Sequence, residues 1–384
     1  MDNQKLKPYI LWTPKPHITE ELYNSKQPDV KQLANVVKYV GENTGNLVYL
    51  EGIKAILPEE TSIAAWGSCP EDASCLIFPA ANQLGKHTDL GDLAKFWRAK
   101  TKKSIVLGLG IQAIHAQKEI ILKAGTEAWL KEIINELESE GKFLICRGDE
   151  TKDFINKRAN APVAVAAGCP SQFISTPQEI LSGIQQRLSK ELTSITVNAN
   201  DPVWEEYFEL EKKLIDEVVL QDGRYILQAP IHAIVAGLLN AKRIRQKMNA
   251  ADVLSFRELT NSDFFKNYAE VFISIPNWRF CLEQCDYNVG TRIHGCMMSL
   301  AVGIPSFLFS VDRRTEEFAK TMHLPYTSDL NVEDPIAYSK EKLRSHNFEE
   351  MLSVWRKHAT VFNELLLSYG VTPNTHFLKN WTAY

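Results

Sequence analysis

The chain has 384 residues, of which 45% are hydrophobic and 23% are charged, and its formal net charge is -4. This length exceeds what one hydrophobic core usually supports, so we expect two domains. The composition is that of an ordinary globular protein. The small negative charge argues against broad nucleic-acid binding, but it leaves room for a local basic pocket that binds a small anion.

The N-terminal residues 1–8 contain no apolar run long enough for a signal peptide, so we expect no export and a cytoplasmic location. The longest uncharged stretch covers residues 295–311 and contains Gly303 and Pro305. It is short for a bilayer span, and the two helix-breaking residues predict a helix, a turn and a strand instead. No transmembrane segment is therefore expected.

Seven cysteines are scattered through apolar surroundings. An odd number in such places favours reduced thiols over a disulfide framework. Cys281 and Cys285 are spaced by one helical turn, with His294 and Cys296 further along, so a zinc site has to be considered. The short loop that usually separates paired zinc-binding cysteines is missing, and we prefer buried free thiols without a metal.

Apolar runs typical of strands alternate with helical patterns along most of the chain, which predicts an α/β fold with parallel sheets. In the first half the expected strands are residues 46–50, 75–78, 104–107, 143–146 and 163–166. In the second half they are residues 194–198, 225–228, 253–256, 286–289 and 306–309. Two α/β halves follow from this alternation.

Helical periodicity is clearest at residues 125–140, at 205–219 and in a long C-terminal helix that runs from Phe348 to near Gly370. An amphipathic stretch after the last expected strand of the first half places the domain junction near residues 175–192. We therefore predict an N-terminal domain over residues 1–180, a C-terminal domain over 181–340 and a helical tail over 341–384.

Gly108, Gly110 and Ala113 follow the strand 104–107 with the Gly-x-Gly-x-x-Ala spacing of a dinucleotide-binding loop. The acidic residue that should contact the ribose would be Glu127 or Glu132, and both lie inside an expected helix. NAD is therefore disfavoured. Two interpretations stay open, a tight turn and a glycine loop whose backbone N–H groups approach a substrate anion.

Arg147 stands at the end of the expected strand 143–146, where side chains of parallel strands point into the ligand crevice. It is a candidate clamp for an anion. An ion pair with Asp149 or Glu150 at the following helix start is an equally good interpretation.

Arg292 and His294 have the same placement in the second half, after the strand 286–289 and a Gly290-Thr291 turn. The first turn of a helix favours a bound anion, which would raise the pKa of the imidazole and keep it protonated as an acid. A capping or core histidine fits the spacing equally well. Arg313 and Arg314 follow the next strand and add positive potential to the same edge.

Several of these segments resemble the polysaccharide pyruvyl transferase family. The most specific is Arg-x-His-Gly within residues 290–295, which is followed by Gly-Ile-Pro at 303–305 and Asp-Arg-Arg-Thr at 312–315. Weaker likeness covers the glycine loop at 107–111, the strand-end arginine segment at 146–154 and the stretch 278–286. The resemblance extends over roughly residues 75–330.

The resemblance implies an enzyme that moves a pyruvyl group from phosphoenolpyruvate onto two hydroxyls of a sugar in a polysaccharide or glycolipid precursor. A cyclic ketal forms and phosphate is released, with no other cofactor and no metal. The implied fold is similar to GT-B glycosyltransferases, with two Rossmann-like domains facing a central cleft and a C-terminal helix returning to the first domain. His294 takes the general acid/base position, and Arg292 and Arg147 take the donor-binding positions.

This assignment is chemically reasonable, because two guanidinium forks match the phosphate and carboxylate of the donor and an imidazolium suits protonation of its methylene carbon. Further candidates for substrate binding are Ile293, Gly110, Asn82 and Arg313. The resemblance also implies that the N-terminal half faces the acceptor and that the C-terminal half holds the donor. Near the first strands the glycine-rich run of many family members is missing, so the acceptor is less defined than the donor. Asn82 and His87 are candidates for acceptor contact, and a surface loop is the preferred interpretation for His87.

Two alternatives stay open at this point. One is a nucleotide-sugar glycosyltransferase on the same scaffold, because a fold does not determine a function. The other is a non-catalytic relative that binds sugar. If the acceptor is lipid-linked, peripheral association with a membrane is expected, without a membrane span.

Overall fold

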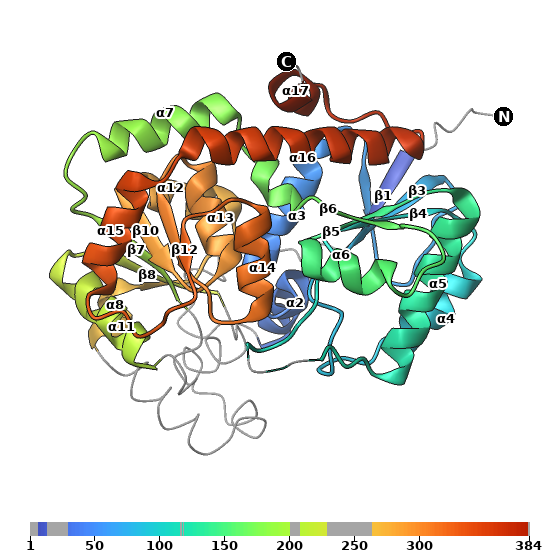
Figure 1. Ribbon diagram of the computed structural model, residues 1–384, viewed down its shortest axis with the longest axis horizontal. Coiled ribbons are helices and arrows are strands. Elements are labelled where there is room, and N and C mark those ends of the chain that lie inside the picture. Colours follow the sequence, from blue (N-terminus) through green and yellow to red (C-terminus); the bar gives the residue numbers. More distant parts are fainter. Residues whose placement is uncertain are drawn as a thin grey trace.

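The computed structural model describes residues 7–13, 30–115, 117, 119–199, 208–228 and 263–382. Figure 1 shows two α/β halves side by side, with helix α16 (Phe348–Ser368) lying across both. Every described strand pairing is parallel. The predicted class, α/β with two Rossmann-like halves, is confirmed.

The first sheet has the order β2-β1-β3-β4, formed by β1 (Lys7–Leu11), β2 (Ser62–Ala64), β3 (Ala73–Pro79) and β4 (Ser104–Leu107). An isolated bridge between Leu109 and Cys146 continues it to the pair β5 (Leu144–Cys146) and β6 (Ala164–Ala166). The strand order reverses direction between β1 and β3. In open α/β sheets ligands bind in the crevice at such a switch point, beyond the carboxyl ends of the strands.

The second sheet has the order β12-β11-β10-β7-β8-β9. Its strands are β7 (Ile195–Ala199), β8 (Arg224–Leu227), β9 (Ala269–Glu270), β10 (Tyr287–Gly290), β11 (Ser306–Phe309) and β12 (Tyr326–Thr327). Numbered within this half, the order of the described strands is 3-2-1-4-5-6, which is the strand order of the Rossmann fold. The switch point lies between β7 and β10, so the segment after β10 opens directly into the crevice.

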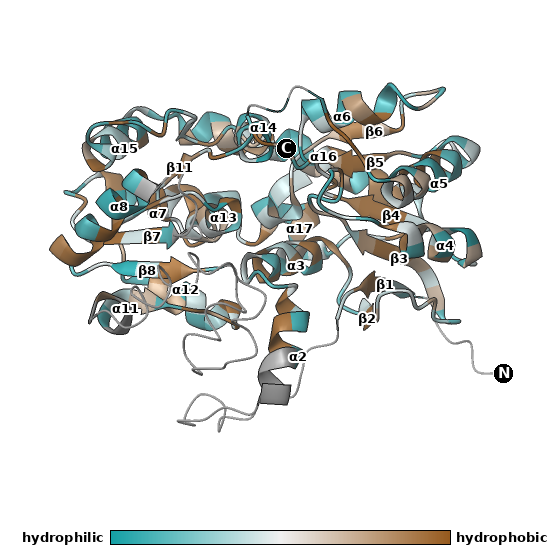
Figure 2. Ribbon diagram, turned by 90° about the horizontal axis from the view of Figure 1, so that it is seen from below, coloured by the Kyte–Doolittle hydropathy of each residue, from teal (hydrophilic) through white to brown (hydrophobic). Residues whose placement is uncertain are grey.

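The helices connect the strands and cover the sheets. Figure 2 shows the hydrophobic strands of the first sheet beside helices α4 and α5, which are largely hydrophilic. The remaining bounds are α2 (Val30–Val40), α3 (Gly45–Ile56), α4 (Gly91–Ala99), α5 (Ala124–Glu140), α6 (Asp149–Asn156), η1 (Pro170–Phe173), α7 (Pro177–Leu188), α8 (Phe208–Leu220), α11 (Asp263–Tyr268), α12 (Ile275–Glu283), α13 (Ile293–Ala301), α14 (Arg313–Thr321), α15 (Pro335–Ser345), α17 (Thr375–Phe377) and η4 (Leu378–Thr382).

Most expected elements are observed within two residues at each end, and β4 and β11 have the predicted bounds. The strand expected at 253–256 lies outside the described residues. The strand expected at 46–50 is wrong, because these residues belong to helix α3. This helix packs against both η1 and α13 and buries eight of its residues. A helix buried on several sides loses the 3.6-residue periodicity and looks like a buried strand in the sequence.

The C-terminal segment returns from the second half to the first. After α16 the backbone N–H of Asn374 donates to the carbonyl of Ile56 in α3 over 3.0 Å. Phe377 packs edge-on against Phe173, with 5.0 Å between the ring centroids. This is the expected return of the C-terminal helix to the first domain. No helix in the described part of the chain is both long and apolar enough to cross a bilayer.

His358 on α16 is buried, and its Nδ1 lies 3.0 Å from Oε1 of Gln172 in η1. Burial lowers the pKa of this imidazole from 6.5 to about 4. The folded state therefore loses stability as the pH falls from about 6.5 towards 4, by up to about 3 kcal/mol for this group. We measure the free energy of unfolding in urea between pH 7 and pH 4. The decrease in this free energy on acidification should be smaller in His358→Met than in the wild type. The control His376→Gln, which changes an exposed histidine, should show the same decrease as the wild type. Equal pH slopes in both variants would contradict this prediction.

Candidate active site

The start of α13 carries the Arg-x-His-Gly segment. Helix α13 begins directly after β10 and the Thr291 turn, with Arg292 at its N-cap position and no side chain capping it. His294 is the second residue of the helix and so lies in its first turn, as the sequence predicted. The first N–H groups of an uncapped helix, together with its dipole, favour an anion at this point.

Gly295 lets α13 approach the neighbouring strands closely. A Cβ atom at this position would lie 2.2 Å from Cγ of Asn198 and 2.4 Å from Nε2 of Gln228. These amides are buried and joined to others: Asn198 donates to Asn288, which donates to the hydroxyl of Ser306 over 2.5 Å. The glycine of the segment is therefore required by packing at the switch point.

Substituting Gly295 with alanine should destabilise the protein by about 1–3 kcal/mol, because the added Cβ would overlap the buried amides of Asn198 and Gln228 and force them to shift. We expect a lower melting temperature and a lower midpoint in urea. Gly91→Ala is the matched control, since a Cβ there would meet its nearest atom at 3.5 Å. A Gly295→Ala protein as stable as Gly91→Ala would show that the amide network adjusts freely.

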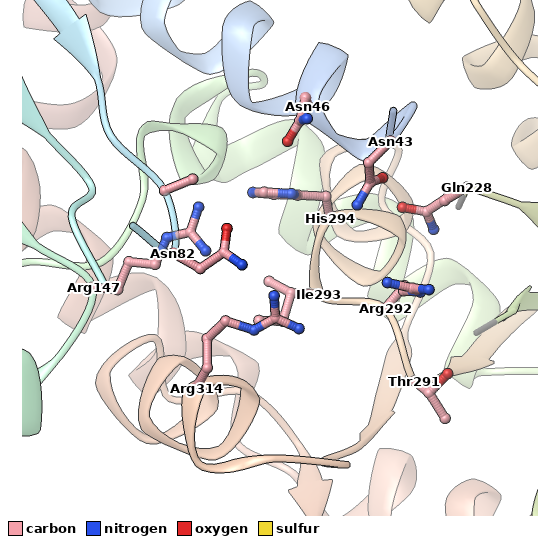
Figure 3. A pocket seen from close by; sticks show the side chains of 11 residues that line it. Asn43, Asn46, Asn82, Arg147, Gln228, Thr291, Arg292, Ile293, His294 and Arg314 are labelled. Atoms are coloured by element: carbon pink, nitrogen blue, oxygen red, sulfur yellow. The ribbon is translucent and has the colours of Figure 1, made fainter. Parts of the chain in front are cut away.

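A pocket lies between the two halves, where the switch point of the second sheet faces the first half. Figure 3 shows the side chains of Arg147, Arg292 and Arg314 around a common space beside the His294 ring. The full lining is Asn43, Asn46, Ala81, Asn82, Arg147, Gln228, Thr291, Arg292, Ile293, His294 and Arg314. No carboxylate is among these described lining residues, so the pocket is strongly cationic.

Arg147 reaches this pocket from the end of β5 and is 3% exposed. Its Nε donates to the carbonyl of Gly108 over 3.0 Å, and its guanidinium lies 5.9 Å from the centroid of the Tyr49 ring. Its Nη2 is buried and has no hydrogen-bond partner among the described residues. Gly110 leaves room for the side chain, since a Cβ there would lie 3.0 Å from Cδ of Arg147.

The alternative role of Arg147, an ion pair at the start of α6, is not observed. Asp149 is instead paired with Lys152, and Glu150 with Arg313. The buried Arg147 lines the pocket instead.

His294 is buried, and its ring is stacked on Tyr49 with 5.9 Å between the centroids. Its Nε2 lies 3.7 Å from Sγ of Cys169. Burial lowers the pKa of His294 well below 6.5, and the charges of Arg147 and Arg314 lower it further. The increase in the pKa of His294 that the sequence analysis expected therefore requires a bound anion whose negative charge offsets the charges of the two arginines.

Of the two neighbouring arginines of α14, Arg314 lines the pocket and Arg313 does not. Arg314 is paired with Asp312 at 3.2 Å, and its Nε is buried without a hydrogen-bond partner among the described residues. Arg313 instead contacts Glu150 and the carbonyl of Gln117 in the first half. Consecutive helical residues point about 100° apart, so only one of the two can face the pocket, and the sequence could not show which.

Glu317 on the same helix adds a further link between the halves. Its carboxylate accepts hydrogen bonds from the backbone N–H of Thr151 at 2.6 Å and from the Thr151 hydroxyl at 3.0 Å. Helix α14 therefore supplies one arginine to the pocket and two side chains that hold the first half against it.

Several lining residues were not expected from the sequence. Asn43 lies in the turn before α3, and Asn46 lies in the first turn of this helix, which was predicted as a strand from residue 46. Tyr49 and Cys169 contact His294 from outside this lining and carry no motif that would indicate contact with a histidine. Asn82 and Ile293 line the pocket, whereas His87 does not. All seven cysteines are free, and no described group of His, Cys, Asp or Glu side chains is arranged to hold a metal ion.

These features define an α/β protein of two parallel-sheet halves with a cationic pocket between them. The model of a family described as polysaccharide pyruvyl transferase matches residues 6–313. The chain belongs to the polysaccharide pyruvyl transferase family, which confirms the resemblance found in the sequence and makes the protein a member of a family of transferases.

Solved structures with a similar arrangement are distant. UDP-N-acetylglucosamine 2-epimerase from Rickettsia bellii is 10% identical with a TM-score of 0.43, and the match covers 95% of this chain and 96% of that one. A putative UDP-N-acetylglucosamine 2-epimerase from Listeria monocytogenes is 10% identical with a TM-score of 0.39, covering 94% and 96%. Likenesses this weak say nothing about substrate or mechanism. No curated protein matches the chain in sequence.

Proposed function

We propose that this protein is a pyruvyltransferase that moves the pyruvyl group of phosphoenolpyruvate onto two hydroxyls of a sugar in a polysaccharide or glycolipid precursor. A cyclic ketal forms and phosphate is released. Family membership supports pyruvyl transfer to a polysaccharide. The observation that supports an anionic donor is the pocket itself, in which three arginines and a histidine converge without a lining carboxylate.

The two partnerless N–H groups strengthen this proposal. Nη2 of Arg147 and Nε of Arg314 are buried without hydrogen-bond partners among the described residues. A buried polar group left in this state costs about 1–3 kcal/mol, and more when it is charged. Phosphoenolpyruvate carries a phosphate and a carboxylate, so it would supply acceptors to both arginines and to the N-terminus of α13. A lysine would hold the same charge with less control of orientation.

His294 is the proposed acid. It would protonate the methylene carbon of the donor, so that C2 becomes an oxocarbenium-like electrophile and bonds to the oxygen of the first sugar hydroxyl. The imidazole regains its proton from that hydroxyl. The C2–O bond to phosphate then breaks, the second hydroxyl adds to C2, and its proton leaves with the phosphate. The arginines and the helix N-terminus would stabilise the departing phosphate, so these steps require no metal.

The lowered pKa of His294 leaves its imidazole neutral near pH 7 in the free protein. The negative charges of the donor would offset Arg147 and Arg314 and raise this pKa. Donor binding should therefore bring a proton to His294, and the acid would form only when the donor is present.

The test is incubation with phosphoenolpyruvate and a panel of galactosides, mannosides and N-acetylhexosaminides. Phosphate release together with a gain of one pyruvyl group in the mass of the sugar would establish the reaction. A parallel series with nucleotide sugars tests the glycosyltransferase alternative. Release of the nucleotide in that series would count against our proposal. Sugar binding without turnover in either series would favour the non-catalytic relative. We further propose a cytoplasmic location, with peripheral membrane association if the acceptor is lipid-linked.

A further inference from the structure

A second pocket lies at the switch point of the first sheet, beyond the carboxyl ends of β1 and β3. Trp12 follows β1, Trp66 follows β2, and Ala81 and Gln83 follow β3. Neither tryptophan has a part in the donor site proposed above.

Both indoles are held in place by other groups. Nε1 of Trp12 donates to the carbonyl of Tyr39 over 3.0 Å. Trp66 packs against the buried Phe78, with 5.0 Å between the ring centroids and 79° between the planes. Trp66 nevertheless remains 40% exposed. A fixed, half-open aromatic surface suits the apolar face of a sugar ring, because it offers large contact area with little loss of side-chain entropy.

The second pocket adjoins the cationic one. Asn46 and Ala81 line both. Tyr49 lines the aromatic pocket and stacks on His294, so its ring lies between the two. A ligand bound over Trp66 could extend past Asn46 to within reach of a molecule held by Arg147 and His294.

The chemistry of the second pocket differs from that of the first. Among its described lining residues Lys38 is the only charged side chain. Nδ2 of Asn46 donates to the carbonyls of Val40 and Gly41, and Oε1 of Gln83 accepts from the N–H of Ala81, so Oδ1 of Asn46 and Nε2 of Gln83 are the amide atoms left to meet hydroxyl groups. An aromatic surface with amides and one cation fits a neutral or acidic sugar better than a small trianion. The cationic pocket, which is lined by three arginines, fits the small trianion better.

We propose that this aromatic pocket is the acceptor subsite, with a pyranose ring stacked on Trp66 and its hydroxyl pair directed past Asn46 towards the donor. The inference rests on the proposed function, since ketal formation requires both hydroxyls next to C2 of phosphoenolpyruvate. It places the sugar at the switch point of the first sheet, in the half that the family resemblance already assigned to the acceptor, and names Trp66 as the surface that holds it.

The test compares Trp66→Ala with Trp66→Phe, which keeps an aromatic ring. For a glycoside that the wild type pyruvylates, we expect the acceptor KM to rise at least about tenfold in Trp66→Ala, less in Trp66→Phe, and the donor KM to stay within about twofold. Phe280→Ala is the control, because Phe280 is 69% exposed and lines neither pocket. Thermal melts would show that each variant is folded. An unchanged acceptor KM in a folded Trp66→Ala protein would overturn the subsite while leaving the function intact.

A binding measurement separates failure of the subsite from failure of the function. Methyl β-galactoside, α-mannoside, N-acetyl-β-glucosaminide and β-glucuronide are used as probes in saturation-transfer NMR, with and without phosphoenolpyruvate. If the wild type binds a sugar but transfers no pyruvyl group, and Trp66→Ala abolishes that binding, the sugar subsite is supported and the pyruvyltransferase function is rejected. Binding that survives Trp66→Ala, or no binding and no transfer with any probe, would overturn the subsite.

Discussion

Replacing His294 with alanine is expected to lower kcat for pyruvyl transfer by about 100- to 10,000-fold, which is the range for loss of a general acid. The imidazole lies in the cationic pocket beside Arg147 and Arg314, where it is buried and neutral in the absence of donor. Binding of phosphoenolpyruvate should be retained, because the arginines are unchanged. Initial rates of phosphate release and a donor titration by calorimetry measure the two quantities separately.

His294→Gln is the matched variant, since it keeps a polar side chain of similar reach but cannot supply an acidic proton. Calorimetry in two buffers of different ionisation enthalpy should show proton uptake on donor binding by the wild type near pH 7 and none by His294→Gln. This follows because the free imidazole is neutral and the donor raises its pKa. An unchanged rate in His294→Ala would reject the mechanism, and equal proton uptake in both proteins would place the proton on another group.

Replacing Arg147 with alanine is expected to raise the donor KM by about 10- to 100-fold, the equivalent of losing hydrogen bonds to a charged group. The acceptor KM should change much less, because Arg147 lines the cationic pocket and not the aromatic one. Steady-state kinetics with each substrate varied in turn measure this difference.

Arg147→Lys is the control for charge without the guanidinium fork, and we expect an intermediate donor KM from it. Because Arg147 is buried, thermal melts of both variants are needed to exclude general unfolding. A larger effect on the acceptor than on the donor would assign Arg147 to the sugar and reverse the proposed arrangement.

Some of the features behind these two predictions could be recognised from local sequence patterns. Arg147 directly follows an expected strand, and Arg292 follows another across the Gly290-Thr291 turn; strand ends of this kind are local patterns. For the same reason β4, β11 and the start of α13 were predicted close to their observed positions. The Arg-x-His-Gly segment also indicated the family, which the match over residues 6–313 confirmed.

Other features could not be predicted because they arise from contacts between distant segments. Helix α3 was taken for a strand, since its burial between η1 and α13 removes the polar face by which a helix is detected. The choice of Arg314 over Arg313 depends on the rotation of α14 against the first half, where Glu317 and Arg313 are engaged.

Local sequence was therefore sufficient for the class of fold, most of the strands, the family and the position of Arg147, Arg292 and His294 after strand ends, because hydrophobic periodicity and strand-end residues are short-range properties. Tertiary structure alone brought Arg147 and His294 together across the cleft, lowered the pKa of the imidazole by burial, placed Tyr49 against both, and placed Trp66 in the adjoining pocket. These properties depend on which surfaces of α3, α13 and α14 face one another, and helix packing over long sequence separations decides that.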